Sequence, residues 1–160
     1  MTDRVIAVAA WESLFRAQVT VMRALADTFP TGLISLNEYD VLFNISRSPG
    51  RRLRLKDLNR SVLISQPSVS RMLDRLAARA IVTKSPDPDD GRGTIVAMTE
   101  QGFALYRRVA IEHMVAIERN VAAGLDEDEL LALTDLCRRM RLAIAEPLIG
   151  EPTESPAHHA

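Results

Sequence analysis

The residues with the clearest chemistry gather on one face of a helix that the sequence predicts from Ser65 to about Arg79. At about 100° per residue, four apolar side chains share one side, and the opposite side and the helix start are mostly polar. Serine, glutamine and arginine near a helix start are suited to bonding base edges and phosphates. A polar helix that merely faces solvent is the alternative. The residues expected to contact a nucleic acid are Ser65, Gln66, Pro67, Ser68, Ser70, Arg71 and Arg75.

The start of this helix is strongly marked. Ser65 can cap it, and Pro67 suits the first turn because its missing N–H costs nothing there. Asp74 opposes DNA binding locally, and it lies three residues from Arg71, so the two can pair. The apolar side, expected to face the core, consists of Val69, Met72, Leu73 and Leu76.

A second candidate contact is Arg92, which stands between two glycines in a run of turn-forming residues from 85 to 93. Strand-like segments at 81–84 and 94–98 flank this run, so we expect a hairpin with a long tip. A guanidinium on a thin hairpin can enter the DNA minor groove. Alternatively, Arg92 pairs with Asp89 or Asp90 to order the loop. Both can hold, and we expect Asp90 to brace the hairpin.

The charge distribution favours a polyanion as partner of the middle of the chain. The 160 residues carry a net charge of −1, but residues 47–92 hold 11 basic and 5 acidic residues, a net charge of +6. The remainder carries −7. A basic middle between acidic ends is typical of a polyanion-binding region, and an ordinary fluctuation of solvated charge is the alternative. Arg54 and Lys56 belong to this segment and are further candidate DNA contacts.

Elements of defined type must position these side chains. We expect a helix over 37–47 capped by Asn37, a short strand at 52–55 and a brief helix around 58–63. Followed by the Ser65 helix and the hairpin, this order is that of a winged helix-turn-helix, whose second helix enters the major groove. The predicted fold class is therefore mainly α with a small β-wing.

Long amphipathic helices flank this unit. They are expected over 4–29, over 99–124 with Thr99 as cap, and from 126 to Pro147, each with an apolar stripe. We predict a helical dimerisation region of residues 1–34 and 100–147, a DNA-binding region of 35–99 and a disordered tail of 148–160. Cys137 lies in the last stripe and is expected to pack in the core.

At the wing, the sequence resembles the MarR-type transcriptional regulators. The family pattern is an aspartate, any residue, an arginine, and then a strand that ends in a hydrophobic residue and threonine, with a glycine soon after. The resemblance covers roughly residues 10–145. The matching residues are Asp90, Arg92, Met98, Thr99 and Gly102, with the helix segment from Arg71 to Leu76.

The resemblance implies a homodimer on a pseudo-palindromic operator, most often a repressor that a small aromatic ligand releases from DNA. The candidate effector pocket comprises Trp11, Phe15, Arg16 and His113, although dimer or core packing explains the same residues.

The chain departs from the family pattern at two positions. Ala80 stands where a glycine is usual, so this turn is expected to differ in shape. Lys56 stands where a serine or threonine cap is common, and it can reach a phosphate instead.

Several classes of protein are disfavoured by the sequence. One cysteine precludes an internal disulfide or a cysteine-rich zinc site. The longest uncharged run spans ten residues, so we expect no membrane helix and a cytoplasmic protein. There is no catalytic constellation, phosphate loop or metal-spaced cluster, so we expect neither an enzyme nor a cofactor. The dimerising region of some methyltransferases is also a winged helix, but such enzymes continue into a glycine-rich nucleotide-binding fold for which the sequence gives no signal, so we do not expect this class. A winged helix used only for protein contacts remains the alternative function.

Overall fold

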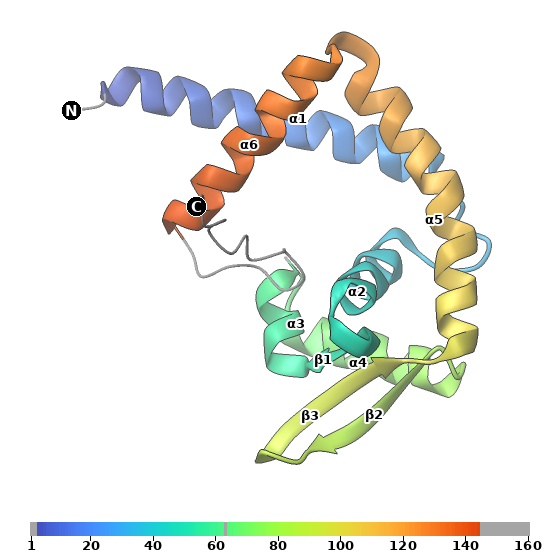
Figure 1. Cartoon of the computed structure of the whole chain (residues 1–160). Helices are drawn as coiled ribbons and strands as arrows, with labels where there is room; N and C mark the ends of the chain where they lie inside the picture. Colours follow the sequence, from blue (N-terminus) through green and yellow to red (C-terminus); the bar gives the residue numbers. More distant parts are fainter. Residues whose placement is uncertain (1–2, 63, 145–160) are drawn as a thin grey trace, which may run out of the picture.

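The computed structural model describes residues 3–62 and 64–144 and confirms a mainly helical fold with a small β-wing. A winged-helix region at one end is connected to long helices that extend away from it (Figure 1). In chain order, the elements are α1 Arg4–Thr28, α2 Leu36–Arg47, η1 Pro49–Arg51, β1 Arg52–Arg54, α3 Leu55–Ser61, α4 Gln66–Ala78, β2 Val82–Asp87, β3 Asp90–Met98, α5 Glu100–Val121, η2 Ala122–Gly124 and α6 Glu127–Ile144. The predicted tail lies outside the described residues, as does Pro147.

The core lies in the winged-helix region. Helices α2, α3 and α4 pack around the sheet, and the side chains of Leu42, Leu58, Leu73 and Val96 are completely buried there. The four residues predicted for the apolar side of α4 are all buried. Burial on this scale stabilises each large aliphatic side chain by about 1.5–3 kcal/mol.

The start of α2 differs from the prediction. Ser35, not Asn37, is the N-cap: the Glu38 N–H donates to its hydroxyl at 3.2 Å. The Glu38 carboxylate accepts from the Ser35 N–H at 2.8 Å, which completes a capping box. The serine-to-glutamate spacing of three was available in the sequence and outweighs a lone asparagine.

The wing is a three-stranded antiparallel sheet in the order β1–β3–β2. Leu53 pairs with Val96, and Val82 pairs with Met98. The prediction of a long tip is wrong, because pairing continues to Asp87 and Asp90 across a bulge near Pro86. Proline is tolerated there since β2 is an edge strand. The long, narrow hairpin projects from the rest of the molecule (Figure 1).

The turn after α4 keeps the left-handed shape that glycine favours. Ala80 has a φ of 56°, so the expectation of a different turn is wrong. The Ala80 N–H donates to Ala77 O at 2.9 Å and the Ile81 N–H to Leu76 O at 3.0 Å, the bonds of a Schellman motif. The Thr99 hydroxyl also donates to Ala80 O at 2.7 Å. These bonds offset a strain of about 1 kcal/mol in alanine.

The turn after α4 also connects the start of α5 to the winged-helix region. Thr99 caps α5 as predicted, because its hydroxyl accepts from the Gly102 N–H at 2.9 Å. A Cβ on Gly102 would lie 2.0 Å from Ile81 O, so only glycine fits. Arg51 forms an ion pair with Glu100, and its guanidinium lies 4.3 Å from the centre of the Phe103 ring. The first turn of α5 is therefore held by η1 on one side and by the segment just before β2 on the other.

Helices α1, α5 and α6 leave apolar surface uncovered. Trp11 is 60% exposed on α1 and Leu136 is 58% exposed on α6, and α6 has no buried residue among those described. Helix α1 is also the one described helix that is long and apolar enough, by length and composition alone, to cross a membrane, but a core helix of a soluble protein and an N-terminal signal sequence pass the same test. Glu12, Arg16 and Arg23 interrupt its apolar surface.

Candidate nucleic-acid interface

The outer face of α4 presents the predicted contact residues. Arg71 and Arg75 are exposed, and Ser65, Gln66 and Pro67 are exposed around the helix start, while Ser68 and Ser70 are half-buried. Pro67 lies in the first turn as expected. The N-terminus of α4 therefore offers hydroxyl, amide and guanidinium groups to one side, and the helix dipole adds positive potential there.

One prediction about the helix start is wrong. Ser65 occupies the N-cap position, but its side chain makes no capping hydrogen bond. Its hydroxyl lies 2.9 Å from the Ser68 hydroxyl instead. The Arg71 guanidinium is 3.5 Å from the same Ser68 oxygen. The three side chains thus form one polar cluster on the surface of the first turns.

Asp74 does not pair with Arg71. Its carboxylate accepts from Lys84 Nζ at 2.7 Å, which joins α4 to β2. The sequence favoured the nearer arginine because three residues is one helical turn, but the hairpin brings Lys84 closer. As a result, the local acidic charge is balanced by the wing and Arg71 stays available to an external partner.

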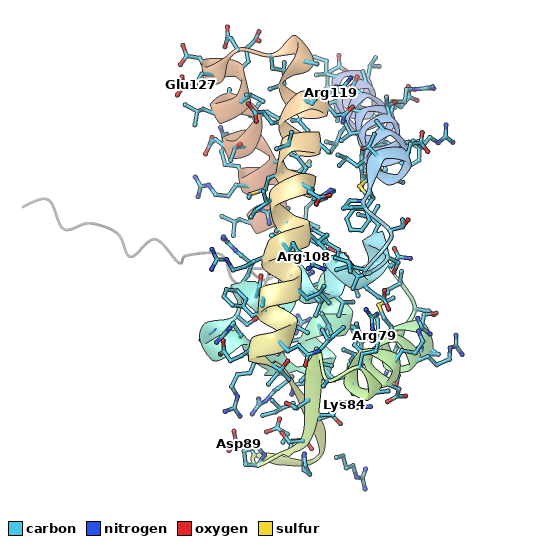
Figure 2. The ribbon with its side chains drawn as sticks, turned by 90° about the vertical axis from the view of Figure 1, so that its right-hand side faces the viewer. Arg79, Lys84, Asp89, Arg108, Arg119 and Glu127 are labelled. Atoms are coloured by element: carbon cyan, nitrogen blue, oxygen red, sulfur yellow. The ribbon has the colours of Figure 1, made fainter. Side chains whose placement is uncertain are left out.

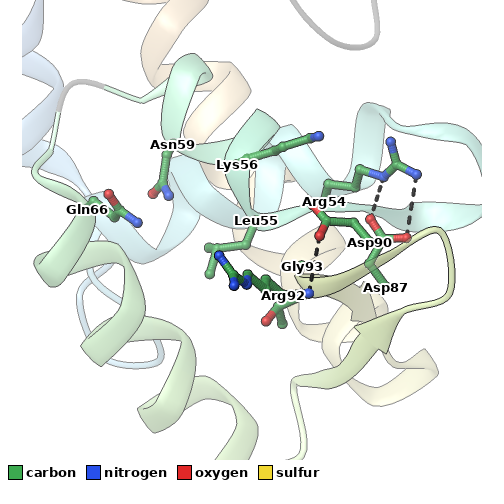
Figure 3. A pocket seen from close by; sticks show the side chains of 10 residues that line it. Arg54, Leu55, Lys56, Asn59, Gln66, Asp87, Asp90, Arg92 and Gly93 are labelled. Carbon is green, nitrogen blue, oxygen red and sulfur yellow. Dashed lines mark hydrogen bonds and ion pairs between the residues drawn. The ribbon is translucent and has the colours of Figure 1, made fainter.

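Four of the predicted contacts line a single groove between α3, the start of α4 and the wing (Figure 3). They are Arg54, Lys56, Gln66 and Arg92, and the groove has a volume of about 180 Å³. Lys56 is exposed on the first turn of α3, where α3 has no side-chain cap. The predicted contacts thus bring three cations and the Gln66 amide to one groove, although the acidic Asp87 and Asp90 also line it.

The wing tip is braced by a network that includes Arg54. Arg54 Nε lies 2.6 Å from Asp87 Oδ2 and its Nη2 lies 2.9 Å from Asp89 Oδ2. The Asp87 side chain is only 1% exposed and also accepts from the Asp89 N–H at 3.1 Å. Arg54 is therefore occupied within the protein.

Asp90 braces the tip in a different way from a charge pair. Its carboxylate accepts from the backbone N–H of Arg92 at 3.1 Å (Figure 3). Asp89 forms an ion pair with Arg54, so neither Asp89 nor Asp90 forms an ion pair with the Arg92 side chain. Within residues 3–62 and 64–144, no hydrogen bond or ion pair engages the Arg92 guanidinium. The arrangement can present this cation to a negatively charged groove.

Two residues of this surface were missed by the sequence analysis. Asn59 lines the groove one helical turn beyond Lys56, and its side-chain oxygen is buried with no hydrogen-bond partner among the described residues. That spacing of three was the available signal. Asp87 falls within the predicted turn at 85–93, and nothing local in the sequence marks it as buried.

The structure does not bring the four predicted effector residues together. The Trp11 and Phe15 rings lie 5.8 Å apart on the exposed first half of α1, and Arg16 is exposed there. His113 is 5% exposed and packs against Phe29, just beyond the other end of α1. At 1.5 Å per residue, Phe15 and Phe29 are roughly 20 Å apart.

His113 instead belongs to an aromatic cluster that joins α1, α2 and α5. Its ring centre is 5.2 Å from that of Phe29 and 4.7 Å from that of Tyr39, and Tyr39 stacks on Tyr106 at 5.4 Å. Burial lowers the pKa of His113 and raises the pKa of Tyr39. Both rings are therefore neutral at pH 7, as core residues, and His113 Nδ1 has no partner among the described residues.

Comparison with known proteins identifies the family. A MarR family model matches residues 34–93, which cover nearly all of the winged-helix region. The transcriptional regulator PecS of Dickeya dadantii is 30% identical over 135 residues, 80% of this chain and 77% of PecS.

Solved structures share the fold. Sco3205, a MarR family regulator of Streptomyces coelicolor solved in complex with DNA, superposes with a TM-score of 0.73 at 22% identity, over 93% of this chain and 94% of its own. BpsR of Bordetella bronchiseptica, whose DNA binding is regulated by 6-hydroxynicotinic acid, gives a TM-score of 0.70 at 25% identity, over 82% and 98% of the two chains. These structures agree in fold, and the family model and the PecS relationship show that the chain belongs to the MarR family of DNA-binding transcriptional regulators and is not an enzyme.

Proposed function

We propose that the protein is a homodimeric repressor that binds a pseudo-palindromic DNA operator, with α4 in the major groove and the wing in the adjacent minor groove. The observation that carries this docking is the position of Arg71 and Arg92. One lies on the exposed face of α4 and the other near the wing tip, and neither guanidinium is paired with a carboxylate among the described residues. Base edges are read in the major groove, and a narrow minor groove attracts arginine.

The remaining contacts follow from the same docking. Ser65, Gln66 and Ser68 at the start of α4 face the base edges or the flanking phosphates, and Lys56 on α3 faces the phosphate backbone. Arg54 supports the wing and reaches DNA at most through its remaining half-exposed surface. A winged helix that binds only proteins would not need this convergence of cations on one groove.

The apolar faces of the long helices support the dimer. Val5, Trp11, Ile111 and Leu136 are each at least half exposed in one protomer. Uncovered apolar surface on this scale marks an interaction site. In a symmetric dimer, a second protomer covers the apolar faces of α1, α5 and α6. The two α4 helices then lie about one helical turn of DNA apart.

The same dimer gives a place for a small aromatic ligand. In this proposal the ligand binds where α1 and α5 meet the winged-helix region, beside His113, and it releases DNA by favouring a dimer with wrongly spaced α4 helices. Regulation of BpsR by an aromatic acid supports this class of ligand. Trp11, Phe15 and Arg16 join the site only if the partner protomer carries them there. The proposed location is the cytoplasm.

Genome-wide capture of bound DNA, followed by titration of the recovered duplex, tests the function. We expect one site per dimer, and log affinity should fall steeply and linearly with log salt, since several phosphates are contacted per protomer. A scrambled duplex of the same length is the control. Binding that does not distinguish the two duplexes, or that ignores salt, would contradict the proposal.

A further inference from the structure

A hollow of about 310 Å³ lies on the outer side of the molecule, where the end of α4 and the start of β2 meet α5. Figure 2 looks onto this face, with Arg79 and Arg108 labelled. The hollow shares no residue with the DNA-contact set or with the predicted effector set. It is lined by Arg79, Ile81, Gln101, Ala104, Leu105 and Arg108.

The two arginines give this hollow a positive charge. Arg79 is held in place, because Nη2 donates to Leu33 O at 2.6 Å and Nη1 lies 3.7 Å from Glu38 Oε1. In the part of the chain that the structure describes, no hydrogen bond or ion pair engages Arg108. Glu38 shares the charge of Arg79, and no carboxylate lines the hollow. The unmatched charge is thus that of Arg108.

The rest of the lining is mainly apolar. Ile81 is 2% exposed, Leu105 is half-buried, and Ala104 leaves space because its side chain is small. Gln101 adds an amide that can donate or accept. Small-molecule sites are typically apolar hollows with a few convergent polar groups, and paired guanidiniums select carboxylates.

We propose that this hollow binds a small carboxylate with an apolar body, held between Arg79 and Arg108. The ligand would contact the turn after α4 and the first half of α5 at once. These two segments are already joined there, since the Thr99 N–H donates to Ile81 O at 3.1 Å. A ligand in this position would therefore stabilise one orientation of α4 relative to α5.

Isothermal titration of the full chain with benzoate, in the absence of DNA, tests the site directly and does not depend on the proposed operator binding. The neutral amide benzamide is the control ligand. We expect benzoate to bind and benzamide to bind at least about tenfold more weakly, as expected for the loss of one charge-assisted contact.

Arg108→Gln is the decisive variant, because the Arg108 side chain is exposed and its loss should not affect folding. It should weaken benzoate binding about tenfold. Ala104→Phe should abolish binding by filling the hollow with both arginines intact. Arg119→Gln is the matched control, an exposed arginine three turns further along α5, and it should leave binding unchanged.

Three results would overturn the proposal: no benzoate binding, equal loss in Arg108→Gln and Arg119→Gln, or loss in Arg16→Gln but not in Arg108→Gln. The last would place the ligand on α1. Loss of DNA binding with intact benzoate binding would contradict the proposed function and leave this site standing.

Discussion

The winged-helix region buries its large apolar side chains within one protomer, whereas the long helices leave many of theirs exposed. Leu42, Leu58 and Leu73 are completely buried within the winged-helix region of a single protomer. Leu131 and Leu136 on α6 and Trp11 on α1 are about 60% exposed. Uncovered apolar area of this kind costs about 25 cal/mol per Å² relative to burial. One protomer therefore supplies a complete core for the region that reads DNA, whereas the long helices require a second surface.

The largest effect should come from opening the complete core. Leu73→Ala should lower the free energy of unfolding by about 2–5 kcal/mol, because it deletes a fully buried side chain at the centre of α4. Chemical denaturation measures this. The same truncation at Leu136 should cost the isolated protomer under about 1 kcal/mol, since that side chain is already exposed. Equal losses at the two leucines, independent of protein concentration, would refute the comparison.

A charge on the uncovered surface should separate the protomers. Leu136→Glu would place a carboxylate in the proposed interface, so light scattering should report a monomer at micromolar concentration. Affinity for a full operator should then fall roughly 100-fold, because one half-site no longer raises the effective concentration of the other. The far-ultraviolet circular dichroism should be unchanged. A dimeric Leu136→Glu protein with normal affinity would place the interface elsewhere.

The two exposed arginines should have separable effects on DNA. Arg71→Ala should lose about 1–3 kcal/mol of discrimination between the operator and a mismatched duplex, if Arg71 reads a guanine. Arg92→Ala should weaken binding mainly at AT-rich flanks, where the minor groove is narrow. Anisotropy titrations with matched, mismatched and flank-exchanged duplexes distinguish the two, and Arg119→Ala is the control. If neither variant alters affinity or specificity, the docking is wrong.

The wing brace offers a smaller and more local test. Asp87→Asn removes the charge that faces Arg54 while keeping the side-chain shape, and should lower the free energy of unfolding by about 1–2 kcal/mol, less than for a fully buried pair because Arg54 is partly exposed. Asp89→Asn, at the 78% exposed partner, should cost under about 0.5 kcal/mol. Chemical denaturation of both variants shows which of the two carboxylates stabilises the wing more. A larger loss from Asp89→Asn would show that the buried carboxylate is not the brace.

Local signals in the sequence were sufficient for the elements and for the faces of α4. The apolar spacing of Val69, Met72, Leu73 and Leu76 identified the buried side, and Thr99 identified the start of α5. These features depend on residues within a few positions of each other. The same holds for the capping box, because Ser35 and Glu38 are only three residues apart, and that spacing is a stronger signal than the lone Asn37.

Contacts between distant segments could not be predicted in this way. Lys84 reaches Asp74, and Arg54 reaches Asp87, only because the hairpin folds back beside α4 and β1. The Schellman bonds and Thr99 hold Ala80 in a left-handed turn against its own preference. Trp11 and His113 have side chains suited to one aromatic pocket, and the sequence therefore favours a shared site. In the structure, most of the length of α1 separates them within one protomer.

The smallest expected effect concerns His113, which lies where the two regions meet. Burial lowers the pKa of this residue below its ordinary value of 6.5, so the unfolded chain binds the proton more tightly than the folded one. The stabilising contribution of the neutral ring is therefore complete above about pH 6.5 and is lost as the pH falls through the lower pKa of the folded state. Denaturation midpoints at pH 7.5 and 5.5 measure the loss. His113→Phe keeps the aromatic packing on Phe29 and Tyr39 but cannot titrate, so its midpoint should fall less over the same interval. An identical fall in both proteins would mean that other groups cause the acid sensitivity and that the contact between α5 and the winged-helix region does not respond to pH.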